Sequence, residues 1–265
     1  MILKHASICT GSGLMLRDLC LEAGLPTGLF DVVLVDHDVS DAIIAHDVPL
    51  AVKFCVQGRL YNNGETCVSA KRFVVTAAVY DNFVGAFVEQ MKAITMGEPS
   101  AEDTQLGPVA SKEQFDILSE QVTKSIAGGA TLLCGGVPDK EVGYYFPATV
   151  LADCQPGTPA YDDELFGPVA SIIKASDDAD AMRIANDSRY GLGGGIFTKD
   201  ENKAFRLARD HFDTGMVRIN TFGTADPNMP FGGVKDSGYG REHGGFGMKE
   251  FVNVKAIYMQ QSVQS

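Results

Sequence analysis

The sequence predicts an α/β fold built on a largely parallel sheet. Three observations predict it: segments with apolar residues at helical spacing, short apolar runs typical of buried strands, and the regular alternation of the two along the chain. Such alternation produces crossover connections that place helices against a parallel sheet. With 265 residues, of which 45% are hydrophobic, the chain can bury a sizeable core.

The first part of the chain predicts one helix–strand–helix passage. Apolar spacing predicts a helix over 14–20 that stops at Gly24, a residue type that commonly ends helices. A run of Val and Leu predicts a buried strand over 32–35. A short helix is expected over 41–46, with Ser40 as its N-cap.

The rest of the chain continues this alternation. Residues 221–247 are rich in Gly, Pro and Asp and predict a long loop, and such loops in compact domains are usually functional or disordered. The final strand precedes a polar tail and is expected to pair with another sheet, for example in another subunit. Helices are expected over 50–60, 79–94, 112–126, 177–186 and 202–211, and strands over 73–75, 131–133, 144–150, 195–198, 216–219 and 251–259.

Composition excludes several classes of function. A net charge of −12 repels phosphate backbones and argues against nucleic-acid binding. No apolar run approaches the length of a membrane span, and the N-terminus lacks a secretory signal pattern. The six cysteines show no CxxC pair and no metal-ligand spacing, so neither disulfides nor a metal site is expected. A reducing, cytoplasmic location fits best.

The segment 62–72, Asn-Asn-Gly-Glu-Thr-Cys-Val-Ser-Ala-Lys-Arg, is the most informative stretch. Cys67 follows a glycine turn at the end of a helix, so its thiol is expected to be accessible and a local N–H can act as an oxyanion donor. Lys71 and Arg72 would favour the thiolate. The alternative is an ordinary buried cysteine, the usual state of a free thiol. Spacing alone leaves both possibilities open.

Three ordered stretches resemble motifs of the aldehyde dehydrogenase superfamily. Segment 62–72 is similar to its cysteine signature, and Asp-Glu-Leu-Phe-Gly-Pro at 163–168 is similar to its Glu-Ile-Phe-Gly-Pro motif. Pro-Phe-Gly-Gly-Val-Lys at 230–235, with Ser-Gly and Gly-Arg-Glu following within 237–242, is similar to a third. The opening Leu-Lys-His-Ala at 3–6 resembles the strand with the cofactor-binding lysine. The likeness is greatest to succinate-semialdehyde dehydrogenases and their relatives.

The resemblance implies a chemistry for Cys67. In this family a cysteine thiolate attacks a small aldehyde to give a thiohemiacetal. Hydride then passes to NAD or NADP, and water hydrolyses the remaining thioester to the acid. Succinate semialdehyde is one candidate substrate. Choosing between NAD and NADP requires segments that this chain does not carry.

The resemblance also implies roles for five further residues. Glu164 matches the carboxylate that binds the nicotinamide ribose, and Phe166 would pack beside the ring. Lys4 matches the lysine that contacts the adenosine ribose or its phosphate. Asn220 fits an asparagine near the catalytic loop, with a strand-end cap as the equal alternative. Phe231 would line the substrate funnel. Without the family context, the first three would be interpreted as a surface acid, a core aromatic and a surface lysine.

The family likeness further predicts the domain organisation. Residues 1–48 would be a remnant of the NAD(P)-binding domain. Residues 49–248 would form the catalytic domain, a three-layer α/β unit with a parallel sheet. Residues 249–265 would provide a C-terminal oligomerisation strand and tail. The expected partners are further copies of the chain or full-length subunits.

Three departures from the family pattern limit the expected activity. The N-terminal part of the family is missing. Between 43–48 and 49–52 the cofactor-binding Gly-Ser-Thr-like turn and the segment with the general-base glutamate are absent. Glu65 replaces the usual glutamine and would oppose formation of the thiolate. We therefore expect the chain by itself to oxidise aldehydes poorly or not at all. The alternatives are a non-catalytic binding or oligomerisation protein and, ranked last, a thiol hydrolase.

Overall fold

The computed structural model describes residues 2–3, 31–32, 48–138 and 143–260. The chain divides into two compact units, residues 1–42 and 43–265. In the first unit, β1 (Ile2–Leu3) pairs in parallel with β2 (Asp31–Val32). The helices predicted over 14–20 and 41–46, and the remainder of the strand predicted over 32–35, lie outside the described residues.

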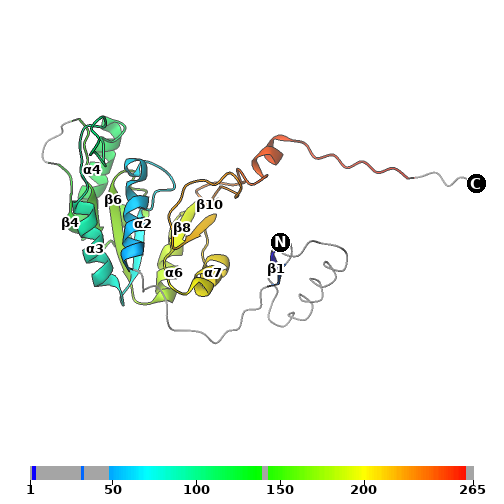
Figure 1. Ribbon diagram of the computed structural model, residues 1–265, viewed down its shortest axis with the longest axis horizontal. Helices are drawn as coiled ribbons and strands as arrows, with labels where there is room; N and C mark the ends of the chain where they lie inside the picture. Colours follow the sequence, from blue (N-terminus) through cyan, green and yellow to red (C-terminus); the bar gives the residue numbers. More distant parts are fainter. Residues whose placement is uncertain (1, 4–30, 33–47, 139–142, 261–265) are drawn as a thin grey trace, which may run out of the picture. The chain divides into compact units, whose positions relative to one another are not determined.

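A four-stranded sheet forms the centre of the second unit (Figure 1). Its order is β3 (Arg72–Thr76), β6 (Val169–Ala175), β5 (Thr149–Ala152) and β4 (Thr131–Cys134). The first three strands are parallel, and β4 joins β5 in the antiparallel direction. The predicted α/β class with a largely parallel sheet is therefore confirmed.

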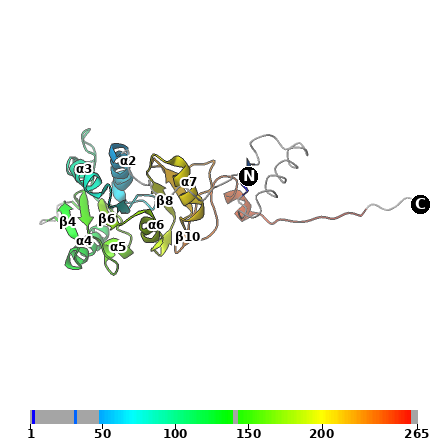
Figure 2. The ribbon, with the colours of Figure 1, turned by 90° about the horizontal axis from the view of Figure 1, so that it is seen from below.

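Helices cover both faces of this sheet (Figure 2). On one face lie α2 (Val48–Leu60) and α3 (Tyr80–Lys92). On the other lie α4 (Lys112–Ala127), α5 (Pro159–Asp162) and α6 (Asp178–Asn186). The unit thus has three layers, and the longer helices begin and end within two residues of their predicted bounds.

Strand β6 shows how the sequence produces two cores. Val169 and Ile173 pack into the core with the apolar faces of α4, α5 and α6. Ala170 and Ile172 point the other way, into the core with α2 and α3. This alternation follows from the two-residue period of a strand, and burial on both faces explains why β6 is a continuous apolar run. Periodicity did not predict β6, because such a run carries no alternating pattern.

A second, smaller sheet follows in the chain. β8 (Gly193–Ile196) and β9 (Met216–Ile219) pair in parallel, with α7 (Glu201–Asp210) between them in sequence. β7 (Tyr190–Gly191) pairs antiparallel with β10 (Val234–Lys235), which lies inside the predicted loop over 221–247. The remainder of that loop has mostly irregular backbone, as predicted.

The C-terminal segment differs from its prediction. A 3-10 helix, η3 (Gly247–Phe251), occupies the start of the expected strand, and residues 253–260 have irregular backbone. Val254 and Tyr258 are 95% and 94% exposed. A strand requires a neighbour to satisfy its backbone hydrogen bonds, and the described part of this chain supplies none there. Pairing with another subunit remains a prediction.

In the described ranges, no helix is both long enough and apolar enough to span a membrane. The same ranges hold no group of three or more His, Cys, Asp or Glu side chains placed to bind a metal ion.

Candidate active site

Cys67 lies on an exposed turn between the end of α2 and the start of β3. The chain leaves α2 through η2 (Tyr61–Gly64), where Asn62 and Asn63 take φ values of 51° and 56°. Asparagine tolerates this left-handed backbone better than most residues. The prediction that a glycine turn presents an accessible Cys67 is therefore confirmed.

Gly64 brings the cysteine segment against the Phe-Gly-Pro segment. Its φ is +76°, and a Cβ at this position would lie 2.2 Å from the carbonyl oxygen of Gly167. Such a contact leaves no room for any side chain. Two motifs that are about a hundred residues apart in sequence therefore meet backbone to backbone, next to the thiol.

Arg59 anchors this junction from within α2. Its side chain is fully buried, and it donates to the carbonyl oxygens of Gly64 (2.8 Å) and Val169 (3.2 Å). Burial lowers the pKa of Arg59 to about 9, against the opposing effect of the Glu164 carboxylate. Arg59 thus ties the turn that carries Cys67 to the first residue of β6.

Lys71 closes the turn from the other side. Its ammonium donates to the carbonyl oxygens of Thr66 (3.0 Å), Ser69 (3.1 Å) and Cys67 (3.3 Å). It also lies 2.8 Å from Oε1 of Glu164. Burial lowers the pKa of Lys71, whereas the carboxylate of Glu164 opposes that shift. The predicted proximity of this charge to the thiol is confirmed.

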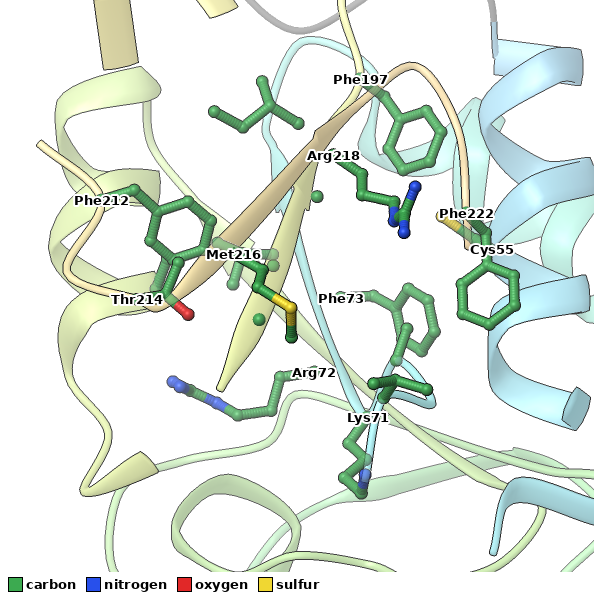
Figure 3. Close-up of a pocket in the computed structure, with 18 of the residues that line it drawn as sticks. Cys55, Lys71, Arg72, Phe73, Phe197, Phe212, Thr214, Met216, Arg218 and Phe222 are labelled. Carbon is green, nitrogen blue, oxygen red and sulfur yellow. The ribbon is translucent and has the colours of Figure 1, made fainter. Parts of the chain in front are cut away.

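Arg72 takes a different direction from its neighbour (Figure 3). Its guanidinium donates to the carbonyl oxygen of Ile184 (2.9 Å) and lies 4.6 Å from the ring centre of Tyr161. Those contacts belong to α6 and α5. The expectation that Arg72 assists Cys67 therefore receives no support from the geometry.

Glu164 and Phe166 lie beside the same lysine. The Glu164 side chain is 35% exposed, and the Phe166 ring centre lies 5.6 Å from the Lys71 ammonium. The backbone of their loop is held from α4, because Gln114 donates to the carbonyl oxygen of Phe166 at 2.6 Å. The structure thus brings together Cys67 and the two residues predicted at the nicotinamide.

The carboxylate of Glu65 is bound away from the turn. Its two oxygens accept from the amide of Ala110 at 2.9 and 3.2 Å. Burial raises the pKa of Glu65, whereas the Ala110 amide opposes that shift. The amide of the loop before α4 therefore partly balances the negative charge that the sequence places two residues before Cys67.

Asn220 acts as a strand-end clamp. Its φ is 55°, and its amide exchanges two hydrogen bonds of 2.8 Å with the backbone of Thr198. These bonds join the ends of β8 and β9. Asn220 also lines the cavity that Cys67 reaches, so a supporting role in catalysis stays a prediction.

The structure does not place Phe231 on the lining of the cavity that Cys67 reaches. Phe231 exchanges backbone hydrogen bonds with Glu242, and its ring centre lies 5.9 Å from that of His243. Lys4 lies outside the described residues.

The thiol opens on a large cavity of about 890 Å³. Cys67, Lys71 and Glu164 lie on its lining, together with residues of α2, β3, β8 and β9 (Figure 3). This volume lies within the range of about 300–1,000 Å³ that is usual for ligand pockets.

Arg59 and the ion pair between Lys71 and Glu164 were not predicted from the sequence. The burial of Arg59 could have been predicted, because this residue follows Val52, Cys55 and Val56 at the helical spacing of a buried face. The ion pair has no such signal, since it joins residues far apart in sequence.

The chain resembles known proteins over most of its length. Residues 45–257 match the model of the aldehyde dehydrogenase family. The chain belongs to the aldehyde dehydrogenase family. The matched region includes all three motifs and every helix and strand of the second unit.

Among aldehyde dehydrogenases, succinate-semialdehyde dehydrogenases resemble this chain strongly. An NADP(+) enzyme of Mycobacterium ulcerans is 36% identical over 303 residues, covering 97% of this chain and 66% of the relative. A second enzyme, from Mycobacterium avium, is 36% identical, and the alignment covers 65% of its length. The chain thus spans slightly less than two thirds of the length of these relatives.

Solved structures of aldehyde dehydrogenases give the same fold. A succinic semialdehyde dehydrogenase from Streptococcus pyogenes in complex with NADP+ has a TM-score of 0.79 and 32% identity, covering 98% of this chain and 67% of that one. A Mycobacterium tuberculosis aldehyde dehydrogenase complexed with NAD+ has a TM-score of 0.78 and 30% identity, with coverages of 97% and 52%.

The alignments also bear on the predicted internal gap. The alignment with the Mycobacterium ulcerans enzyme extends over 303 residues, more than the 265 of the whole chain. Within the aligned region, the relative therefore carries residues that this chain lacks.

Proposed function

We propose that this chain carries the thiol centre of an NAD(P)-dependent aldehyde dehydrogenase, with Cys67 as nucleophile. One observation carries the proposal: the exposed thiol lies on a turn that Arg59 and Lys71 hold against the Glu164–Phe166 loop. The named relatives favour succinate semialdehyde as the substrate and NADP as the cofactor.

The first chemical step uses groups of this chain. The Cys67 thiolate attacks the aldehyde carbon, and a C–S bond forms as the carbonyl π electrons move to oxygen. The developing oxyanion is stabilised by a backbone N–H of the turn. The ammonium of Lys71 is held at the turn by three carbonyl oxygens and brings a positive charge to the segment that carries the thiol.

The residues that are described fit the nicotinamide end of a dinucleotide. The carboxylate of Glu164 is partly exposed and can accept from ribose hydroxyls, although it must share its oxygens with Lys71. Phe166 supplies an aromatic surface beside it. When bound, NAD(P)+ would supply the hydride acceptor that oxidises the Cys67 adduct to a thioester. Lys4 stays the proposed contact for the adenosine ribose.

Hydrolysis of the thioester, which releases the acid, is expected to be the slow step. The resemblance places the general-base glutamate in a segment that this chain lacks, and loss of a general base typically costs about 10²–10⁴-fold. We therefore infer that an acyl group accumulates on Cys67 and leaves slowly.

Intact-mass spectrometry tests the proposal. The protein is mixed with succinate semialdehyde and NADP, quenched in acid and weighed, and then digested to locate the adduct. We expect one succinyl group on the peptide with Cys67 and none in Cys67→Ser, with Cys134→Ser as the matched control. Absence of any adduct from folded protein would refute the thioester.

The second candidate is a non-catalytic protein that binds other subunits. The length of the alignment favours it, because the Mycobacterium ulcerans relative carries residues within the aligned region that this chain lacks. Titration with NADP followed by calorimetry separates the candidates. Binding supports the dehydrogenase, whereas no binding, together with co-purification of longer subunits, supports the binding protein.

A further inference from the structure

Lys71 has more hydrogen-bond acceptors around it than its ammonium has hydrogens. Its Nζ lies 2.8 Å from Oε1 of Glu164, and 3.0, 3.1 and 3.3 Å from the carbonyl oxygens of Thr66, Ser69 and Cys67. An ammonium has three N–H groups, so one carboxylate and three carbonyls cannot each receive a full hydrogen bond. The Glu164 carboxylate and the turn that carries Cys67 therefore compete for the same donor.

The charge of this ammonium is shared in the same way. The Lys71 side chain is 14% exposed and that of Glu164 is 35% exposed, so water screens the pair only in part. Burial and the nearby guanidinium of Arg59 lower the pKa of Lys71, whereas Glu164 and, more weakly, Cys67 oppose that shift. Two groups that can carry a negative charge thus stabilise one buried cation.

Arg59 increases the dependence on Glu164. Its guanidinium is fully buried, and the Glu164 carboxylate opposes the effect of burial on its pKa. One carboxylate therefore compensates two cations, Arg59 and Lys71. Without that carboxylate, Cys67 is the group in the described part of the chain whose negative charge acts on Lys71. A buried cation that loses its counter-charge favours any anion that remains beside it.

We infer that Lys71 is a positioning residue that couples the charge state of Cys67 to the occupancy of the Glu164 carboxylate. A ligand with two neighbouring hydroxyl groups can donate both to this carboxylate and so compete with Lys71 for it. The ammonium then has the three carbonyl oxygens of the turn, one for each N–H, and its charge favours the thiolate. The inference rests on the proposed function, which supplies such a diol in the nicotinamide ribose.

Thermodynamic linkage makes this coupling act in both directions. If hydroxyl groups bound to Glu164 favour the thiolate, the thiolate must favour the binding of those hydroxyl groups by the same factor. Once Cys67 carries an acyl group it is neutral, and the ammonium of Lys71 returns to Glu164. The diol is then held less tightly. The same side chain would thus help to assemble the site before the attack of the thiolate and loosen it once the thioester has formed.

The first test needs no ligand. Glu164→Gln removes the competing charge and keeps the length of the side chain, so we expect alkylation of Cys67 at fixed pH to be at least about three-fold faster. Glu89→Gln, which removes the carboxylate of an exposed ion pair with Lys92, is the matched control and should leave the rate unchanged. Each rate is measured by peptide mapping, with anionic iodoacetate and with neutral iodoacetamide. The ratio of the two rates reports the charge beside the thiol, which a loosened turn alone would not change.

A double variant separates the route through Lys71 from direct repulsion between Glu164 and the thiolate. Direct repulsion acts whatever residue stands at position 71, whereas the route through the ammonium is lost in Lys71→Met. We therefore expect Glu164→Gln to change the rate by less than about two-fold in the Lys71→Met background. An equal gain in both backgrounds, or no gain in the single variant, would overturn the inference.

Binding of nicotinamide mononucleotide, followed by calorimetry, tests the competition itself. This probe carries the ribose hydroxyls without the adenosine half of the cofactor. Because Lys71 competes for the carboxylate, Lys71→Met should bind the probe at least about two-fold more tightly, and Glu164→Gln should bind it more weakly. Weaker binding by Lys71→Met would overturn the competition. No binding by any form would contradict the proposed cofactor site, while the alkylation rates decide the coupling.

Discussion

Lys71 Nζ lies 2.8 Å from Glu164 Oε1 and joins the two motifs that the sequence places far apart. The same ammonium holds three carbonyl oxygens of the turn that presents Cys67. One side chain therefore fixes the geometry of the turn, brings a positive charge to the thiol and balances the carboxylate proposed to bind the ribose.

Replacing Lys71 should slow the reaction of the thiol. Lys71→Met keeps much of the chain length but removes the charge, so we expect alkylation of Cys67 by iodoacetamide to fall by about 3–10-fold. The rate is followed by mass spectrometry at fixed pH. Lys53→Met, on the exposed side of α2, is the control and should leave the rate unchanged. Equal rates in both variants would show that Lys71 has no influence on the thiol.

The described cysteines should differ sharply in reactivity. Burial raises the pKa of Cys55 to about 12 and that of Cys154 to about 11, so at pH 8 only about one Cys154 in a thousand is a thiolate. We expect substoichiometric iodoacetamide to label exposed Cys67 first. Peptide mapping reports the order, and faster labelling of either buried cysteine would contradict the assigned burial.

Arg59 should matter more for the turn than for global stability. Arg59→Met leaves the carbonyls of Gly64 and Val169 without their donor, which lowers the free energy of unfolding by about 1–3 kcal/mol. It also removes a buried charge whose pKa is lowered to about 9, which offsets part of that loss. We expect the free energy of unfolding to change by less than about 2 kcal/mol. Amide exchange in 64–67 should become about ten-fold faster, and unchanged exchange would argue against an anchoring role.

Glu65→Gln should stabilise the protein in a pH-dependent way. Burial raises the pKa of Glu65 above 4.5 in the folded state, so the charged form costs folding free energy once the pH exceeds that value. Glutamine keeps the acceptor for Ala110 without the charge. The free energy of unfolding, measured with urea, should therefore be higher for the variant at neutral pH. Well below pH 4.5, the two proteins should be equally stable. A neutral-pH difference of opposite sign would contradict this account.

Most of the fold could be predicted because local patterns specify it. The helices over 112–127 and 178–186 have amphipathic spacing and side-chain caps at Ser111 and Asp177, each within one residue of prediction. β6 was not predicted, because burial on both faces removes the alternation of apolar and polar residues that marks a strand. The C-terminal strand was expected from composition, yet strand formation depends on a neighbour that composition does not reveal.

The candidate site was predictable only in part. The accessibility of Cys67 could be predicted from a local glycine turn. Its proximity to Glu164 could be predicted from the ordered motifs. Tertiary contacts decided the rest. The Glu65 carboxylate binds the amide of Ala110, the Arg72 guanidinium lies over the ring of Tyr161, and the ring of Phe231 lies beside that of His243. The predicted place of Phe231 in a substrate funnel stays a prediction.

A rapid-mixing trace of NADPH formation with succinate semialdehyde, run beside Cys67→Ser, tests the central claim most directly. The account predicts a single burst of about one NADPH per chain with little turnover afterwards, and no burst in the serine variant. Sustained production at the rate of a complete enzyme, or a burst that persists without Cys67, would contradict it.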